Sequence, residues 1–190
     1  MFDVLFAHIQ KKVDLSNQER ELIQTFFKYK KLRKRRYLLQ EGSICKQMSF
    51  VSKGAVKSYT IDERGNEHIS VFGWEGWWVS DFASFICGEE TKLNIETIEE
   101  TELLCISREN YEEMLSKTPI MERYFRIVYQ NSLVTKEKRL ISSNTHTAEE
   151  KYRLLIETYP FINQRIPQNL IASYLGLAPE TISRLKKKLL

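Results

Sequence analysis

Glycine is distributed very unevenly along this chain of 190 residues, and that distribution limits the folds open to it. Six of the seven glycines fall between Gly42 and Gly88, and the seventh, Gly176, stands alone near the end. Short runs of β-branched and aromatic residues separate those six glycines at a spacing of roughly ten residues. Glycine turns between short strands are typical of a small antiparallel barrel or sandwich. The flanking segments are nearly free of glycine and are expected to be helical.

The predicted helices begin at recognisable capping residues. Ser16, with Glu19 three residues later, has the pattern of a capping box, and Ser107 is a second candidate N-cap. The strands are predicted at 37–39, 48–51, 55–60, 68–72, 92–97 and 102–106, and the helices at 3–29, 108–115, 119–141 and 148–158, with a polar break at 142–147.

The net charge of +4 is a mild indication of a polyanionic partner. Positive charge is concentrated in two places: residues 28–36 carry seven basic side chains in nine, and residues 184–188 carry four in five. The first segment is expected to be a solvated surface between helix and strand, with phosphate contact as the alternative. The second segment lies in the motif described below.

The location of the protein is predicted from what the sequence lacks. No stretch approaches the roughly 18 apolar residues that cross a bilayer, and the N-terminus has no signal-peptide pattern. The three cysteines, Cys45, Cys87 and Cys105, are scattered without a CxxC or a zinc-binding spacing. We therefore expect a cytoplasmic protein with reduced thiols and no metal site.

The predicted helix over 119–141 has a stripe of mainly apolar residues along one face. Successive members of the stripe are four and three positions apart in alternation, which is heptad spacing. A neighbouring stripe holds Met121, Phe125 and Val128. One stripe would pack on the chain's own strands, and two adjacent stripes leave apolar surface for a partner helix. A wide stripe buried within one chain is the alternative. The residues expected to face a second copy of the chain are Ile120, Tyr124, Ile127, Asn131, Val134 and Ile141.

The sharpest pattern occupies residues 167–188. Pro167 suits a helix start, and Gly176 suits a left-handed C-cap. Ala172 is small where a second helix must cross closely, and Ile182 would bury that second helix. Such a pair is a helix-turn-helix, whose second helix enters the DNA major groove by its N-terminal residues.

DNA contacts would come from exposed residues on and beside the second helix. Arg184 can bind a guanine edge with two hydrogen bonds, and Glu180 can accept one from cytosine. The lysines suit phosphates. An ordinary helical hairpin with a solvated basic end is the alternative. The predicted DNA-binding residues are Gln168, Glu180, Thr181, Ser183, Arg184, Lys186, Lys187 and Lys188.

Together, these features resemble the catabolite-activator and fumarate-nitrate regulator (CRP/FNR) family of bacterial transcription factors over nearly the whole chain. Residues 48–57 look like the strand-turn-strand of that family, and residues 75–81 look like its glycine-acid segment. Residues 171–184 look like its helix-turn-helix, and this motif is the most specific of the three.

The resemblance implies an α+β fold in three parts. Residues 1–118 would form N-terminal helices and an antiparallel β-roll of the cyclic-nucleotide-binding type, 119–143 a dimerisation helix, and 144–190 a helix-turn-helix domain. The implied partners are a second copy of the chain, double-stranded DNA with a near-palindromic site, and RNA polymerase. The family commonly adds a β-hairpin wing after the second helix. The sequence stops at Leu190, so the expected fold has no wing, either because the protein lacks one or because the sequence is a part of a longer chain.

Cyclic-AMP binders of the family carry a glycine-glutamate pair and an arginine-serine pair in the roll. The matching positions hold Ser80 and Asp81, then Thr91 and Lys92, so the arginine that neutralises the cyclic phosphate is missing. Lys92 could supply charge, but without the planar fork of a guanidinium. We expect no usual cyclic-AMP binding and no cofactor, and an effector that is unidentified or absent. The candidate effector-pocket residues are Ser80, Asp81, Thr91, Lys92, Thr135 and Lys136.

Other groups that a sensor of this type can bind find little support in the sequence. An iron-sulfur cluster needs clustered cysteines, and a haem motif would need more than the single residues His8, His68 and His146. A group of tryptophans, Trp74, Trp77 and Trp78, lies beside the predicted pocket and either lines it for an apolar ligand or fills it as core. The second interpretation is favoured.

The predicted function is therefore a dimeric, sequence-specific transcription regulator with an effector-sensing roll. The alternative is a ligand-sensing module that regulates a partner protein without binding DNA. An enzyme is not expected, because the sequence has no nucleophile-base pair, no GxSxG or HExxH motif and no phosphate loop.

Overall fold

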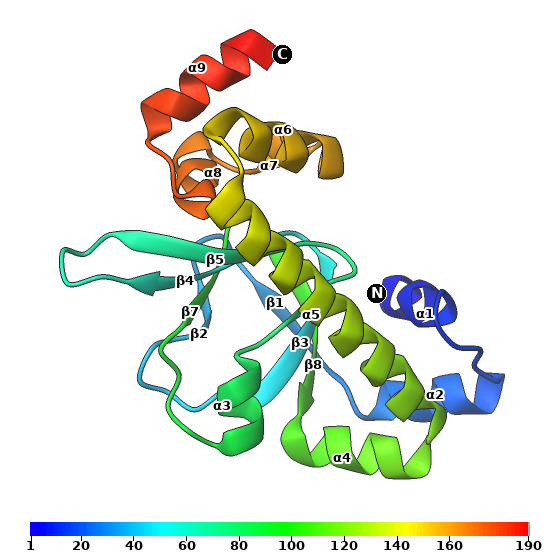
Figure 1. Ribbon diagram of the computed structural model, residues 1–190. Coiled ribbons are helices and arrows are strands. Elements are labelled where there is room, and N and C mark those ends of the chain that lie inside the picture. Colours follow the sequence, from blue (N-terminus) through cyan, green and yellow to red (C-terminus); the bar gives the residue numbers. More distant parts are fainter. Residues whose placement is uncertain (190) are drawn as a thin grey trace. The chain divides into compact units, whose positions relative to one another are not determined.

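The computed structural model describes residues 1–189, which form two compact units (Figure 1). The first unit contains Met1–Thr60 and Val71–Tyr129, and the second contains Ile61–Ser70 and the chain from Gln130 onward. The predicted boundaries at residues 118 and 143 do not coincide with this division, because one long helix contributes to both units. Leu190, the last residue of the predicted domain 144–190, lies outside the described residues.

Eight strands form two four-stranded sheets, ordered β1-β8-β3-β6 and β2-β7-β4-β5. The β1–β8, β3–β8 and β4–β7 pairs are antiparallel, so the predicted antiparallel β-roll is confirmed. The strands are β1 (Lys28–Leu32), β2 (Tyr37–Leu39), β3 (Gln47–Lys53), β4 (Val56–Ile61), β5 (Glu67–Gly73), β6 (Trp78–Val79), β7 (Asn94–Thr97) and β8 (Thr101–Ser107).

Strand β1 replaces the helix predicted for Lys28 and Tyr29, whereas the predicted solvated surface is confirmed, since seven of the nine residues 28–36 are exposed. The segment 3–29, predicted as helical with a capped start at Ser16, forms two helices, α1 (Phe2–Gln10) and α2 (Asn17–Thr25), and its last two residues belong to β1. Strand β1 lies at a sheet edge and pairs with β8 from Lys28 opposite Cys105 to Leu32 opposite Thr101. Backbone pairing with a buried neighbour outweighs a lysine-rich composition, and lysines on an edge strand oppose pairing with other chains.

Two predicted helix starts are confirmed. The Ser16 hydroxyl accepts a hydrogen bond from the Glu19 amide at 3.2 Å, and the Ser16 amide donates to Glu19 Oε2 at 2.8 Å. The Ser107 hydroxyl accepts from the Asn110 amide and begins α4 (Arg108–Lys117). A short helix, α3 (Phe82–Cys87), was not predicted.

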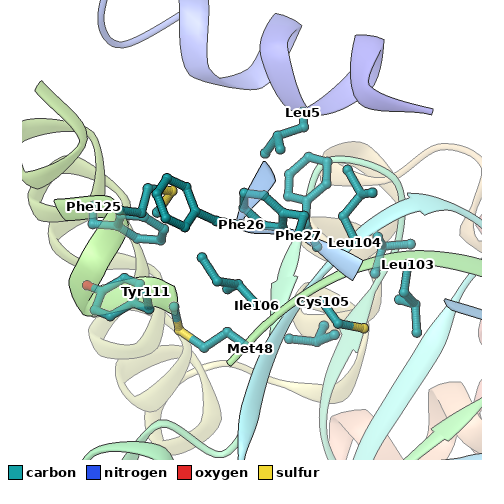
Figure 2. Close-up of a cluster of buried hydrophobic side chains, with 14 of the residues drawn as sticks. Leu5, Phe26, Phe27, Met48, Leu103, Leu104, Cys105, Ile106, Tyr111 and Phe125 are labelled. Carbon is teal, nitrogen blue, oxygen red and sulfur yellow. The ribbon is translucent and has the colours of Figure 1, made fainter. Parts of the chain in front are cut away.

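The core of the first unit lies where α1, α4 and strands β3 and β8 meet the first part of α5 (Ile120–Thr145). Figure 2 shows this cluster, with Leu5 of α1, Met48 of β3, Ile106 of β8, Tyr111 of α4 and Phe125 of α5 gathered together. Leu5, Ile106 and their neighbours Leu103 and Leu104 are fully buried. Burial of this kind supplies most of the stability of a small roll.

Helix α5 runs four residues beyond its predicted end at Ile141 and includes most of the predicted polar break. Hydroxyl groups explain the difference. Ser143 Oγ donates to the Leu140 carbonyl, and Thr145 Oγ1 donates to the Ile141 carbonyl, both at 2.8 Å. These bonds to the preceding turn keep Ser and Thr within the helix. The break is confined to His146 and Thr147.

In the described part of the second unit, helices α6 to α9 follow α5 and surround a separate core. Helices α6, α8 and α9 match the prediction, and α7 was not predicted. Their bounds are α6 (Ala148–Thr158), α7 (Ile162–Arg165), α8 (Gln168–Leu175) and α9 (Pro179–Leu189). The most deeply buried side chains of this unit are Tyr152, Ile162, Ile171, Ala172 and Ile182.

The tip of the β4–β5 hairpin belongs to the second unit and is hydrogen-bonded to α8. Ser173 Oγ donates to the Glu67 carbonyl at 2.6 Å and accepts from the Ile69 amide at 3.1 Å. The Arg139 guanidinium of α5 donates to the carbonyls of Ile69 and Tyr174 and lies over the Tyr174 ring, 4.0 Å from its centroid. No helix within residues 1–189 is long and apolar enough to cross a membrane.

Candidate DNA interface and effector site

The turn between α8 and α9 depends on Gly176. This residue has φ +66°, a left-handed conformation that glycine adopts at little cost. The Leu177 amide donates to the Ala172 carbonyl at 2.9 Å and closes the end of α8. Ala172 is 1% exposed, as its predicted place at the helix crossing requires. The helix-turn-helix predicted from the sequence is therefore present in the described structure.

Helix α9 has one buried side and one cationic side. Ile182 is fully buried and fixes the helix on the core of the second unit. Thr181 and Ser183 are half-buried. The exposed predicted DNA-binding residues are Glu180, Arg184, Lys186, Lys187 and Lys188 (Figure 1, red helix). An exposed helix face with this charge suits phosphates and base edges.

Gln168 stands at the start of α8, where we predicted a contact with DNA. Its Nε2 donates to the carbonyl of Pro179 at 2.9 Å, which joins the first residue of α8 to the first residue of α9. The amide group thus fixes the two helix starts relative to each other. A hollow of about 280 Å³ lies beside it, lined by Arg165 and Lys186 among other polar residues.

Lys188 is the predicted DNA contact that the structure pairs with an acid. Its Nζ lies 2.6 Å from Glu149 Oε2 of α6. Glu149 Oε1 also lies 2.8 Å from a guanidinium nitrogen of Arg153, one helical turn further along α6. The hydrogen bond from Lys188 is the main cause that holds the pKa of the Glu149 carboxyl below its usual range. Sequence analysis missed this pair, because Glu149 is 39 residues from Lys188.

The predicted dimer stripe on α5 has two different environments. Its first part is buried in the first unit: Tyr124 is fully buried, and its hydroxyl lies 2.8 Å from Trp78 Nε1 and 2.7 Å from His8 Nδ1. Tyr124 is therefore occupied within its own chain. Ile120 and Ile127 are half-buried, and Asn131 is exposed.

The second part of the stripe is exposed and apolar. Val134 is 48% and Ile141 59% exposed, as a surface for a second chain requires. Two residues that we did not predict, Leu133 and Leu140, lie beside them and are 59% and 63% exposed. Their seven-residue separation, the same as that of Val134 and Ile141, was the available sequence signal.

The predicted effector residues of the roll bind one another. Asp81 Oδ1 accepts from the Ser84 amide at 3.2 Å and caps α3, and Asp81 Oδ2 accepts from Thr91 Oγ1 at 2.6 Å. Thr91 is 2% exposed, and its hydroxyl also accepts from the Leu93 amide at 2.9 Å. Both carboxylate oxygens of Asp81 are thus engaged inside the protein.

The remaining effector candidates do not add a ligand group to this cluster. Ser80 is half-buried, and Lys92 is exposed. Thr135 and Lys136 are exposed on the part of α5 that belongs to the second unit, where Thr135 Oγ1 donates to the Asn131 carbonyl at 2.8 Å.

Trp78 is part of the aromatic core. Its ring centroid lies 5.4 Å from that of Phe50 and 5.2 Å from that of Phe125. Trp74 and Trp77 contact each other at 5.1 Å, and Trp74 is 8% exposed. These contacts support the interpretation of the tryptophans as packing residues.

The packing of the first unit changes the pKa of His8. Burial, with the positive charges of Lys12 and Lys11, lowers the pKa of its imidazole to about 4. Lys12 Nζ lies 3.1 Å from His8 Nε2. Among residues 1–189, no group of three or more His, Cys, Asp or Glu side chains is placed to hold a metal ion.

Comparison with known proteins finds one family match and several similar regulatory proteins. Residues 29–118 match the cyclic nucleotide-binding domain family. The chain is 26% identical over 179 residues to the fumarate and nitrate reduction regulatory protein of Vibrio cholerae, covering 87% of this chain and 70% of the relative. It is 25% identical over 185 residues to the regulatory protein HlyX of Actinobacillus pleuropneumoniae, covering 90% and 75%.

Among solved structures, that of FixK2 from Bradyrhizobium japonicum has the same fold, with a TM-score of 0.73. The two chains are 21% identical, and the match covers 86% of this chain and 84% of FixK2. The curated relatives are regulatory proteins and not enzymes, in agreement with the prediction that this chain is not an enzyme.

Proposed function

We propose, from the premise that this chain belongs to the CRP/FNR family, that it is a sequence-specific DNA-binding transcription regulator that acts as a homodimer. Its target would be double-stranded DNA with two inverted half-sites about one helical turn apart, as two-fold symmetry of the protein requires. RNA polymerase would be its partner at the promoter, and the place of action would be the cytoplasm.

The observation that carries the proposal is the exposed cationic side of α9. Ile182 anchors that helix, Gly176 sets its angle to α8, and Gln168 ties the two helix starts together. In this arrangement Arg184 is free of the core and can bind a guanine edge, while Lys187 faces solvent and suits a phosphate.

The dimer proposal rests on the second part of α5. Leu133, Val134, Leu140 and Ile141 present an apolar strip to solvent. Leu140 follows Leu133, and Ile141 follows Val134, by seven positions, so a second copy of the helix can pack against the strip along its length. Asn131 and Lys138 interrupt the apolar seam and would limit the pairing to one register.

The roll is proposed not to bind cyclic AMP in the usual way. The carboxylate of Asp81 caps α3 and accepts from Thr91, so a ribose hydroxyl would have to displace bonds already made. Lys92 is the nearest substitute for the missing arginine, and it offers a point charge in place of a bidentate fork. An effector of another chemical class, or none, is proposed.

A gel-shift assay combined with light scattering tests this function. The expected result is a retained complex of two chains per duplex at low salt, lost steeply as salt rises. Absence of any retention at low salt would contradict the proposal and favour the module that regulates a partner protein without DNA.

A further inference from the structure

The end of α9 is held against α6 by a three-residue ion-pair cluster. Glu149 lies in the first turn of α6, and its two carboxylate oxygens are each bound by a different cation. Lys188 Nζ is 2.6 Å from Oε2, and an Arg153 guanidinium nitrogen is 2.8 Å from Oε1. One carboxylate therefore occupies the space between an ammonium and a guanidinium.

Lys188 and Arg153 form a site for an anion, and the Glu149 carboxylate occupies that site. A backbone phosphate presents the same feature as the Glu149 carboxylate, namely two anionic oxygens that accept charge-assisted hydrogen bonds. The side chains of Lys188 and Arg153 are 64% and 53% exposed, so a ligand from solvent can reach both cations. Glu149 is the least exposed of the three, at 31%.

The cluster is not needed to hold α9 in place. Exposed ion pairs contribute little to folding stability, because solvent screens them and the side chains lose entropy. Helix α9 is instead anchored by Ile182, which is fully buried, and by the Gln168 bond to the Pro179 carbonyl. Holding α9 in place therefore does not account for the pairing of Glu149 with Lys188.

We propose that Lys188 and Arg153 form a phosphate-binding pair for the DNA backbone, and that Glu149 occupies this pair in the free protein as an internal competitor. The inference rests on the proposed DNA-binding function and adds to it a residue that sets affinity. DNA would displace the Glu149 carboxylate, and its negative charge would remain beside the phosphate. Glu149 thus weakens binding to every sequence alike, which keeps the regulator from being retained on non-specific DNA.

The test measures the affinity of the full chain for a fluorescently labelled, mixed-sequence duplex across a range of salt concentrations. Glu149→Gln should bind about threefold more tightly per chain at low salt, since one more cation is free to replace counterions. The log-log salt dependence should steepen by about 0.9 per chain for the same reason.

The matched control is Glu157→Gln, which makes the same charge change at an exposed position on the same helix. It should raise affinity by less than Glu149→Gln, because it frees no phosphate-binding cation. Equal effects of the two variants would overturn the inference and leave only a general effect of net charge. A lower affinity of Glu149→Gln would also overturn it, since Glu149 would then position α9 for binding.

A second pair of variants tests whether Glu149 acts through Lys188. In the natural background, Lys188→Gln should lose less affinity than Lys187→Gln, because Glu149 already neutralises Lys188. In the Glu149→Gln background the two losses should become equal. The inference would be contradicted if Lys188→Gln lost the same DNA affinity in the natural background and in the Glu149→Gln background. If the unchanged protein does not bind the duplex, the proposed function itself fails, which is a different outcome from any of these.

Discussion

The segment around Asp81 in the first unit and the helix-turn-helix in the second unit use their polar side chains in opposite ways. In the roll, Asp81 and Thr91 bond to each other, and Thr91 is 2% exposed. On α9, Glu180 and Arg184 are exposed, and the core is left to Ile182. The same family resemblance predicts both as binding sites. The exposed side of α9 therefore offers polar groups to a ligand, whereas Asp81 and Thr91 satisfy each other within the roll.

The largest expected effect comes from variants that would disrupt the proposed dimer without altering the roll. Replacing Leu133 and Leu140 by Asp places charge on the apolar strip of α5, where a second helix is proposed to pack. The DNA affinity should fall by about 10²-fold or more, because two half-sites are no longer bound by one linked molecule. Sedimentation analysis should show that the mass falls from two chains to one.

The matched control is Leu154→Asp, since Leu154 is 47% exposed on α6 and lies off the strip. That variant should keep both the dimer mass and the DNA affinity. A double Asp variant that still sediments as two chains would remove the second part of α5 from the interface.

The second prediction concerns the proposed DNA contacts of α9. Arg184→Ala should cost roughly 1–3 kcal/mol of discrimination at one base pair of each half-site, because a bidentate contact to a base edge is lost. Lys187 is proposed to bind a phosphate, so Lys187→Ala should weaken binding to all DNA sequences equally and reduce the salt dependence of the affinity. Binding assays on a set of single-base variants measure both. Unchanged discrimination in Arg184→Ala would show that Arg184 does not read a base.

A smaller effect tests the roll side. Thr91→Val keeps the side-chain shape but removes the hydroxyl that donates to Asp81 Oδ2. The free energy of unfolding should fall by about 1–3 kcal/mol, since a carboxylate loses a donor in a nearly buried site. The DNA affinity of the folded protein should not change. Thr135→Val, at an exposed position on α5, serves as the control and should have little effect on stability.

The same calorimetric or fluorescence melts can be repeated with added cyclic AMP. We expect no rise in Tm, because a ligand that does not bind the native state cannot stabilise it. A rise that depends on the cyclic AMP concentration would contradict the contrast between the two regions, since the Asp81–Thr91 cluster would then open for a nucleotide.

The smallest expected effect concerns pH and lies away from both sites. His8 has a pKa of about 4 in the folded protein, chiefly because of burial, against about 6.5 when exposed. Between these values the unfolded chain binds more protons than the folded chain, so stability is full above about pH 6.5 and is lost as the pH falls towards 4. Because the imidazole is only partly buried, the loss should be on the order of 1–2 kcal/mol.

His8→Gln should remove that part of the pH dependence in denaturant titrations at several pH values. The DNA affinity of the folded variant should remain that of the unchanged protein. A pH profile of stability that is identical in the two proteins would show that His8 is not the group responsible.

Much of the fold could be predicted because local rules and burial agree. The Ser16–Glu19 capping box, the glycine-rich roll and the left-handed Gly176 each follow from a single residue type in its usual place. Strand β1 was missed because its lysines conceal a strand that is held by backbone bonds to β8, whose paired residues are 69 to 77 positions away. Such pairing is not visible in the local sequence.

The site was predictable in part for the same reason. Residues on α9 follow helical periodicity, so their exposed side could be deduced from the sequence, whereas the partners of Asp81 and Lys188 come from distant segments. Heptad spacing placed Tyr124 on the dimer stripe, but spacing cannot distinguish a partner chain from the chain's own core. The bonds to Trp78 and His8 make that distinction only in the folded molecule.

The most direct test of the central claim is selection of bound duplexes from a random-sequence pool by the unchanged protein, without added nucleotide. We expect enrichment of an inverted repeat whose half-sites are separated by about one helical turn, since two copies of α9 would read it together. The proposed function would be contradicted if no sequence were enriched, or if a sequence were enriched only when cyclic AMP was added.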